Sequence, residues 1–280
     1  MDSSIRIEPA SPGCGAEVHG VDLARMDGDA WESVHRAFLD HGVVFFRDQK
    51  LGPDDHLALA RRFGPIVVNK FFPESDANAQ IAEVRKEPAQ QTNIGGGWHT
   101  DHSYDEIPAL GSILVARELP SQGGDTLFAN MRAAYDALSD GLKATLRSLR
   151  AVHSNDHLYG DDGYYHKTDL AGLLKGKSLV GRAVHPVVIR HPDTDQPVLY
   201  VNPGHTRGFL GWSAEESLAL LQFLYAHASS EAFTCRFRWT PGSVAIWDNR
   251  STWHMALNDY QGERRLLHRI TIEGVALRAA

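Results

Sequence analysis

The chain has 280 residues, 42% of them hydrophobic and 22% charged, so it can bury one sizeable core and is not a disordered chain. Its formal net charge of −7 at pH 7 argues against nucleic acid or an anionic membrane surface as the main partner. Two widely spaced cysteines, Cys14 and Cys235, do not make a disulfide framework and are expected to be buried small side chains. Without a secretory signal or an apolar run of bilayer length, the chain is expected to be soluble and cytoplasmic.

The N-terminal part of the chain is predicted to combine short strands with two helices. Apolar runs broken by proline and glycine over residues 5–23 indicate strands joined by turns. Apolar residues at helical spacing predict a helix over residues 29–39, followed by a buried strand over 42–46. A second helix is expected over residues 53–63.

The middle of the chain is more irregular. Residues 112–116 and 126–129 are predicted strands, and residues 139–149 a helix with Ser139 as its N-cap. The stretch from 155 to 176 is rich in Asp, Gly, Tyr and His and is expected to be a long mobile loop. Loops of this length are often lids over a site.

The last third of the chain contains one further helix and then mostly strands. A capping box predicts a helix over residues 213–227, and strands are expected over 233–240, 244–247 and 266–272. No repeat or linker divides the chain, so residues 1–280 are predicted to form a single domain. Strands with helices packed outside them favour a mainly β fold, a sandwich or jelly roll, over alternating βαβ units.

The strongest local motif is Trp98-His99-Thr100-Asp101. In an extended segment, residues two apart point to the same face, so His99 and Asp101 could hold one metal ion together with a further histidine. An isolated His-x-Asp pattern is weak evidence, because capped or hydrogen-bonded pairs are common. A second example, His191-Pro192-Asp193, is flanked by turn-forming residues and is predicted to be a surface turn, not a metal site.

The candidate third ligand is His254, near the end of a predicted buried strand. It precedes a hairpin whose return strand carries Arg265 and Arg269, which a period of two places on one face. Two guanidinium groups on one face of a half-buried strand are costly unless they meet anions, and their planar forks suit carboxylate or sulfonate oxygens. Pairing with surface Asp or Glu side chains is the alternative.

With these residues in place, the chain resembles the TauD/TfdA family of Fe(II)- and 2-oxoglutarate-dependent dioxygenases. The order and spacing of the motifs agree with the family nearly from end to end. The segments that carry the resemblance are Gly20-Val21-Asp22-Leu23, Arg62-Phe63-Gly64-Pro65, Trp98-His99-Thr100-Asp101, Gly123-Gly124-Asp125-Thr126, His185-Pro186-Val187-Val188 and Trp247-Asp248-Asn249-Arg250, followed by His254 and the Arg265/Arg269 pair.

The resemblance implies a double-stranded β-helix, a jelly roll of the cupin type, with one Fe(II) ion. His99, Asp101 and His254 would be the metal ligands and thus the catalytic residues, leaving three coordination positions for co-substrate and O2. Because Asp101 supplies a carboxylate, no position is left for a halide, and hydroxylation is expected. The family often forms dimers or tetramers, so a homodimer or homotetramer is a further expectation.

The resemblance also distributes two anions over the arginine pair. Thr126 and Arg265 would hold the distal carboxylate of 2-oxoglutarate, and Arg269 the anionic group of the substrate. The expected reaction uses O2 and 2-oxoglutarate to hydroxylate a small anionic molecule, such as a sulfonate, sulfate ester, or aryloxy or alkyl carboxylate. It releases succinate and CO2, and hydroxylation beside a heteroatom would cleave the carbon–heteroatom bond.

The substrate pocket is expected to differ from that of taurine dioxygenase. Asn69 and Phe72 align with a His and a Tyr that line that pocket. Lys70, Asn93 and His205 are further candidate polar contacts, with ordinary surface or turn roles as the alternative. A candidate apolar wall, which core packing would explain equally well, consists of Phe71, Phe72, Tyr159 and Phe209.

Two functions from other classes are open at this stage. In a zinc hydrolase the same three ligands would activate water, but Arg265 and Thr126 would have no task. In a catalytically inactive binding protein the fold would persist without turnover. Dependence on iron(II) and 2-oxoglutarate distinguishes the oxygenase from both.

Overall fold

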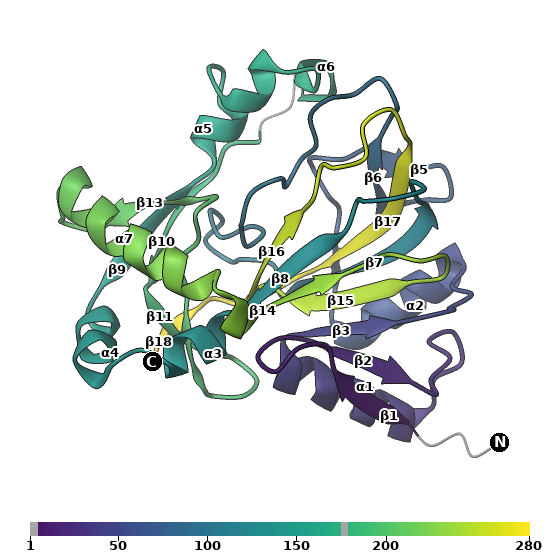
Figure 1. Cartoon of the computed structure of the whole chain (residues 1–280), viewed down its shortest axis with the longest axis horizontal. Helices are drawn as coiled ribbons and strands as arrows, with labels where there is room; N and C mark the ends of the chain where they lie inside the picture. Colours follow the sequence, from purple (N-terminus) through teal and green to yellow (C-terminus); the bar gives the residue numbers. More distant parts are fainter. Residues whose placement is uncertain (1–4, 175–178) are drawn as a thin grey trace.

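A nine-stranded sheet forms the centre of the structure, a computed structural model that describes residues 5–174 and 179–280 (Figure 1). β2 and β3 run parallel, and the other paired neighbours in this sheet run antiparallel. In sheet order the strands are β1 (Arg6–Pro9), β2 (Ala16–His19), β3 (Val43–Phe46), β15 (Val244–Asp248), β7 (Gly111–Glu118), β17 (Arg265–Ile272), β6 (Asn78–Lys86) and β5 (Glu74–Ser75), with β4 (Ile66–Val67) also paired to β17.

A three-stranded sheet packs against the inner face of the central sheet. Its strands, in order, are β14 (Thr234–Phe237), β8 (Thr126–Asn130) and β16 (Thr252–Ala256). Phe128 of β8 contacts both Phe45 and Trp247 of the central sheet, with ring centroids 5.5 and 5.7 Å apart. The two sheets therefore share one apolar core, and the cavity described below opens between them.

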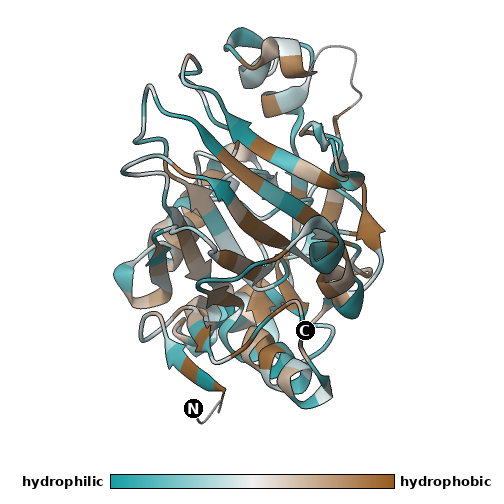
Figure 2. Ribbon diagram, turned by 90° about the vertical axis from the view of Figure 1, so that its right-hand side faces the viewer, coloured by the Kyte–Doolittle hydropathy of each residue, from teal (hydrophilic) through white to brown (hydrophobic). Residues whose placement is uncertain are grey.

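Two helices cover the outer face of the central sheet. They are α1 (Gly28–His41) and α2 (Pro53–Phe63). The apolar run of β3 is buried on both faces, because Val44 and Phe46 pack under these helices while Val43 and Phe45 face the three-stranded sheet. Figure 2 shows hydrophobic residues along the interior strands and hydrophilic residues at many of the outer turns.

A second core lies beside the first. Two small sheets surround it, β10 (Arg182–Pro186), β9 (Arg150–Ser154) and β13 (Thr206–Phe209), and β12 (Pro197–Leu199), β11 (Val188–Arg190) and β18 (Arg278–Ala279). The helices α3 (Met131–Asp136), α4 (Asp140–Arg147) and α7 (Ala214–Ala228) pack around this core, followed by a short 3-10 turn, η2 (Glu231–Phe233).

The predicted fold class, a jelly roll with flanking helices, is confirmed, as are the four predicted helices. Ser139 caps α4, and Ser213 forms the capping box of α7. Cys14 and Cys235 are buried, as expected. No helix in the described part of the chain is long and apolar enough to cross a membrane.

The segment expected to be one irregular loop, residues 155–176, is more ordered than predicted where it is described. It contains three short helical elements, α5 (Asp156–Tyr159), η1 (Tyr164–Lys167) and α6 (Ala171–Leu174), seen at the top of Figure 1. Aromatic packing explains the difference, because Tyr159 and Tyr165 are buried with centroids 5.1 Å apart. Residues 175 and 176 lie outside the described residues.

Two local predictions were wrong. His254 does not precede a hairpin with the arginine strand, because it lies on β16 in the three-stranded sheet while β17 belongs to the central sheet. His191 begins a turn, as predicted, but it is buried rather than on the surface. Its Nε2 lies 3.0 Å from Asp248 Oδ2, an interaction between distant segments that the local turn pattern cannot reveal.

Candidate active site

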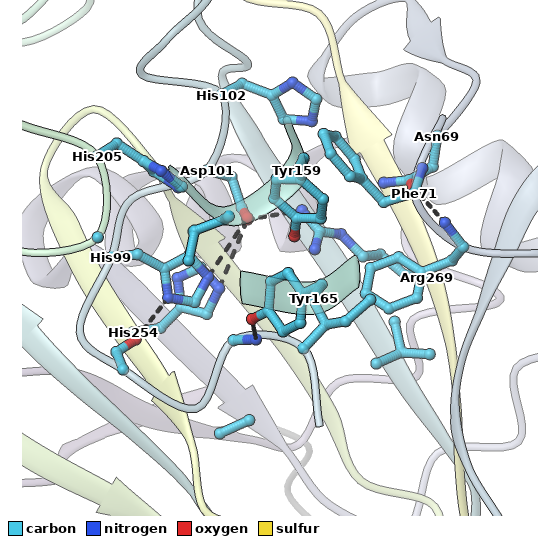
Figure 3. Close-up of a pocket in the computed structure, with 18 of the residues that line it drawn as sticks. Asn69, Phe71, His99, Asp101, His102, Tyr159, Tyr165, His205, His254 and Arg269 are labelled. Atoms are coloured by element: carbon cyan, nitrogen blue, oxygen red, sulfur yellow. Dashed lines mark hydrogen bonds and ion pairs between the residues drawn. The ribbon is translucent and has the colours of Figure 1, made fainter. Parts of the chain in front are cut away.

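Three residues with metal-ligating side chains meet in the cavity between the sheets (Figure 3). One ligand atom from each of His99, Asp101 and His254 can be chosen so that all three lie within 4.8 Å of one another. Nε2 of His99 is 3.6 Å from Asp101 Oδ1, and Nε2 of His254 is 3.5 Å from Asp101 Oδ2. The residues singled out in the sequence are therefore brought together.

Backbone pairing positions this group. His254 lies opposite Phe128 in the β16–β8 ladder, and His99 forms an isolated β-bridge with His254. Asp101 belongs to the following turn, so the motif is a single bridge and a turn rather than the extended strand expected from its sequence. The Thr100 hydroxyl donates to the Asn249 carbonyl at 3.2 Å, which anchors the segment between the two ligands.

The protonation of the group suits a metal ion. His99 Nδ1 lies 2.8 Å from the Gly97 carbonyl, so Nδ1 donates to this oxygen and Nε2 is the ring nitrogen left to face Asp101. Burial, together with His99, lowers the pKa of His254 well below its usual value and keeps its ring neutral. Burial opposes ionisation of Asp101, but nearby positive charge, foremost that of Arg269, outweighs it and holds the pKa of this carboxyl well below its usual value.

The donor set fits Fe(II). Two imidazoles and one carboxylate are the ligands of non-haem iron oxygenases. Imidazole nitrogens and carboxylate oxygens that lie 3.5–3.6 Å apart can all bind one cation placed between them. His99, Asp101 and His254 would therefore hold such an ion.

Arg265 is a buried cation without a carboxylate partner among the described residues. Arg265 lies on β17, and only 4% of the residue is exposed. Neither its Nε nor its Nη2 makes a hydrogen bond. Thr126 lines the same cavity, and its Oγ1 accepts a hydrogen bond from Trp239 Nε1 at 3.0 Å, which leaves its own proton free to donate. A buried guanidinium with unsatisfied donors is costly without an anion, so this corner suits a carboxylate.

Arg269 lies on the same strand and also lines the cavity. Its Nη2 donates to Asp101 Oδ2 at 2.6 Å and to Ser112 Oγ at 2.8 Å, while its buried Nε has no hydrogen-bond partner. Arg269 therefore already has one anionic partner, Asp101, before any substrate binds. This contact connects Arg269, the candidate substrate-binding residue, directly to the proposed metal ligands.

The cavity has a volume of about 260 Å³ and an aromatic wall. Phe71 packs against Tyr159 with ring centroids 4.7 Å apart, and both belong to an apolar cluster over the cavity. The lining residues that form the wall come from four separate segments and include Phe71, Phe72, Ile94, Tyr104, Leu158, Tyr159 and Tyr165.

The predicted substrate contacts are only partly brought together. Asn69, Phe72 and His205 line the cavity, although the Asn69 side chain is also occupied by the backbone N–H groups of Phe71 and Phe72. Asn93 lies in an adjoining cavity. Outside the lining are Lys70, which is exposed, and Phe209, which packs in the second core.

His102 is a lining residue that the sequence analysis missed. It directly follows Asp101, adopts a left-handed conformation with φ of 58°, and its Nδ1 lies 2.8 Å from Asp105 Oδ2. A non-glycine residue in this conformation is uncommon and draws attention to the turn. Its position next to Asp101 was the only available signal, because nothing in the local sequence shows that its ring faces the cavity.

Comparison with known proteins agrees with the chemistry of this site. A sequence model of the taurine catabolism dioxygenase TauD, TfdA family matches residues 6–271. The chain is 36% identical over 267 residues to an alkylsulfatase of Acinetobacter baylyi, covering 93% of this chain and 82% of that protein. It is 33% identical over 282 residues to an (S)-phenoxypropionate/alpha-ketoglutarate-dioxygenase of Sphingobium herbicidovorans, covering 98% and 96%.

A solved structure gives the same assignment. The taurine dioxygenase from Burkholderia xenovorans superposes with a TM-score of 0.83 at 35% sequence identity, covering 99% of this chain and 93% of that one. The resemblance seen in the sequence is thus confirmed over nearly the whole chain. The chain belongs to the TauD/TfdA family of Fe(II)- and 2-oxoglutarate-dependent dioxygenases, which also use O2.

Proposed function

We propose that the protein hydroxylates a small organic anion with an apolar body, at a metal centre held by His99, Asp101 and His254. The observation that carries this proposal is the pairing of two features in one cavity. A group of two imidazoles and a carboxylate lies beside Arg265, a buried guanidinium with unsatisfied donors. A zinc hydrolase would need the first feature but has no use for the second.

In this proposal each polar side chain has a distinct task. Arg265 and the Thr126 hydroxyl hold the distal carboxylate of 2-oxoglutarate, so that its keto acid end faces the metal group. Arg269 uses its remaining donors for the anionic group of the substrate, while its contact with Asp101 fixes the guanidinium relative to the metal ligands. Charge-assisted hydrogen bonds of this kind give both affinity and orientation.

Fe(II), when bound, supplies the redox chemistry by which O2 and 2-oxoglutarate oxidise a substrate C–H bond, with succinate and CO2 as co-products. The chain contributes position and a dry environment. Phe71, Tyr159 and Tyr165 close over the cavity and exclude water from the reacting carbon. Arg269 holds the substrate by its charged end, so the carbon that reacts is the one presented to the metal ligands.

The substrate class follows from the cavity together with the relatives. An aromatic wall opposite an arginine suits an alkyl or aryl group attached to a charged oxygen-rich end. The relatives described above are named for an alkylsulfatase, a phenoxypropionate dioxygenase and a taurine dioxygenase activity. Sulfate esters, sulfonates and aryloxy or alkyl carboxylates are therefore the proposed candidates, and oxidation beside a heteroatom would break the carbon–heteroatom bond.

His102 and His205 are proposed as polar contacts to this substrate. Asp105 binds one ring nitrogen of His102, which leaves the other for a ligand in the cavity. His205 is buried, and its Nδ1 has no hydrogen-bond partner. Asn69 and Phe72 would shape the wall, whereas Lys70 and Asn93 have no role in the proposed substrate site.

We also propose that the chain acts as one domain in the cytoplasm, as a homodimer or homotetramer, without a nucleic acid or membrane partner. Three observations support all of this except the oligomeric state, which is an expectation from the family. The central sheet combines strands from residue 6 to residue 272, the net charge is −7, and both buried cysteines are free thiols. Size-exclusion chromatography with light scattering tests the oligomeric state.

Anaerobic absorption spectroscopy tests the proposed site. The metal-free protein is titrated with Fe(II) and then 2-oxoglutarate, and a visible charge-transfer band is expected when the keto acid chelates the metal. His254→Ala should abolish this band without unfolding the protein. A folded protein that binds zinc and gives no band with Fe(II) would instead favour a hydrolase or an inactive binding protein.

A further inference from the structure

A second cavity adjoins the active site. Its volume is about 200 Å³, and it shares Arg265 and Phe72 with the larger cavity. Its lining also includes Lys86 and Tyr260. The space around the Arg265 guanidinium therefore continues beyond the site already described, toward a second cation.

Lys86 is unusually buried for a lysine. It is the last residue of β6, and only 3% of it is exposed. Its Nζ donates to the Gln261 side-chain oxygen at 2.9 Å and lies 4.5 Å from the centroid of the Tyr260 ring. None of the ion pairs in the described part of the chain includes Lys86. A lysine is rarely buried to this extent without an anionic partner.

The backbone register places Lys86 directly opposite Arg265. The two residues are partners in the antiparallel ladder of β6 and β17, so their side chains project from the same face of the sheet. Like charges at such a position repel each other and destabilise the sheet. Tyr260 lies near both cations, with its ring centroid 6.0 Å from the Arg265 Cζ. The aromatic face reduces the repulsion but does not neutralise two charges.

The same pair has free hydrogen-bonding capacity. Arg265 has two buried nitrogens without partners, and the one hydrogen bond of the Lys86 ammonium leaves other protons available. Two buried cations on one face, lining one cavity and without an ion pair to any carboxylate in the described part of the chain, form a site for an anion.

We propose that Lys86 is a second cation for the distal carboxylate of 2-oxoglutarate, acting with Arg265. This inference rests on the proposed function, because it assigns the co-substrate to that corner of the active site. The Arg265 guanidinium offers a fork of parallel donors, and the Lys86 ammonium adds a point charge from the opposite strand. The co-substrate then removes the repulsion between the two strands, so its binding also stabilises the β6–β17 pair.

Ligand pairs that differ only in the distal carboxylate test this role. 2-Oxopentanoate has the carbon chain of 2-oxoglutarate with a methyl group in place of that carboxylate. Equilibrium binding of both acids to the Fe(II)-loaded protein is measured anaerobically by calorimetry, so that turnover plays no part. We compare the wild type with Lys86→Met, which keeps the side-chain length without the charge, and with Lys86→Arg, which keeps the charge.

Lys86→Met should weaken 2-oxoglutarate about tenfold while the affinity for 2-oxopentanoate stays within about twofold of wild type. Lys86→Arg should recover most of the loss. The matched control is Lys50→Met on the exposed surface, which should bind both acids like the wild type. The separate binding of 2-oxopentanoate shows in the same variant that the site is folded.

Two results would overturn the inference. If Lys86→Met binds 2-oxoglutarate as well as the wild type, Lys86 takes no part in recognition of the carboxylate. If it weakens both acids equally, its role is structural. Failure of the proposed function looks different, because the wild type itself would then bind neither acid in a metal-dependent manner.

Discussion

His99 and His254 are hydrogen-bonded to each other through their backbones. The N–H of His99 donates to the carbonyl of His254 at 3.1 Å, and the N–H of His254 donates to the carbonyl of His99 at 2.9 Å. Their rings lie with centroids 4.1 Å apart. The separation of these two proposed ligands is thus set by main-chain pairing, which does not depend on a bound metal ion or on the identity of either side chain.

This arrangement makes side-chain substitutions at the centre informative. Asp101→Ala should reduce succinate formation at least 100-fold and weaken iron binding, because one of three ligands is lost. The fold should persist, since the bridge between the histidines is made by the backbone. Iron content, succinate release and circular dichroism provide the readouts, with Glu106→Ala, at an exposed acid in the same segment, as a control. An Asp101→Ala protein that keeps its activity would refute the ligand assignment.

The two arginines of β17 should separate the two anions. Arg265→Ala removes the charged partner of 2-oxoglutarate and should raise its half-saturating concentration about 10- to 100-fold, the cost of a charge-assisted hydrogen bond. Arg269→Ala should mainly raise the substrate requirement and also weaken iron binding, because Arg269 pairs with Asp101. Half-saturating concentrations and iron content are measured for both variants. Reversed effects would mean that the anions are exchanged.

His56 should make the metal-free protein less stable in mild acid. It is fully buried, and burial, reinforced by the charge of Arg117, lowers its pKa to about 3. An unfolded histidine titrates near pH 6.5, so below that pH the unfolded chain takes up a proton that the folded chain refuses. Stability attributable to His56 is therefore present above pH 6.5 and is lost as the pH falls toward 3.

His56→Gln tests this dependence. Between pH 7.0 and 5.5 the variant should lose about 1.3 kcal/mol less unfolding free energy than the wild type, the linkage expected for one histidine. Urea unfolding of the metal-free proteins at both pH values gives the two differences. Other buried histidines contribute equally to both proteins and cancel. Identical losses in the two proteins would show that His56 does not titrate on unfolding.

The Asp248–Arg250 pair should be important for stability. Both residues are almost completely buried, Arg250 Nη2 lies 2.7 Å from Asp248 Oδ2, and the charge of Arg250 lowers the pKa of Asp248 despite its burial. Arg250→Met leaves a buried carboxylate without this partner and should cost about 3–5 kcal/mol. Arg190→Met, which breaks an exposed pair with Asp195, should cost less than about 1 kcal/mol. Similar losses in urea unfolding would contradict this ranking.

The sequence revealed the elements with strong local signals. The capping box at Ser213 and the helical spacing around Phe38 predicted helices that the structure contains. It did not reveal β6, whose residues from 78 to 86 are largely polar, although this strand pairs with β17 and with the edge strand β5 of the central sheet. Which residues of β6 are buried depends on its tertiary contacts, and these cannot be predicted from the periodicity of the sequence alone.

The same distinction applies to the site. His99, Asp101 and His254 stand in recognisable motifs, and the structure brings them together. Lys86 stands in no motif, and only the register of β6 against β17 shows that it faces Arg265. Cavity walls assembled from distant segments, such as the one that includes Phe71, are likewise a product of the fold and cannot be derived from local patterns.

Some site residues lie on sheet strands and others on a connection between strands, and this difference has an evolutionary consequence. Arg265 and Arg269 project from β17 of the central sheet, and His254 projects from β16 of the three-stranded sheet. A substitution in either strand disturbs the core between the two sheets. Tyr159 and Tyr165 instead come from short helical segments in a connection between strands. Such connections tolerate insertions and replacements far better than sheets do. The range of accepted molecules can therefore diversify by exchange of this connection, while the oxidative machinery is inherited unchanged.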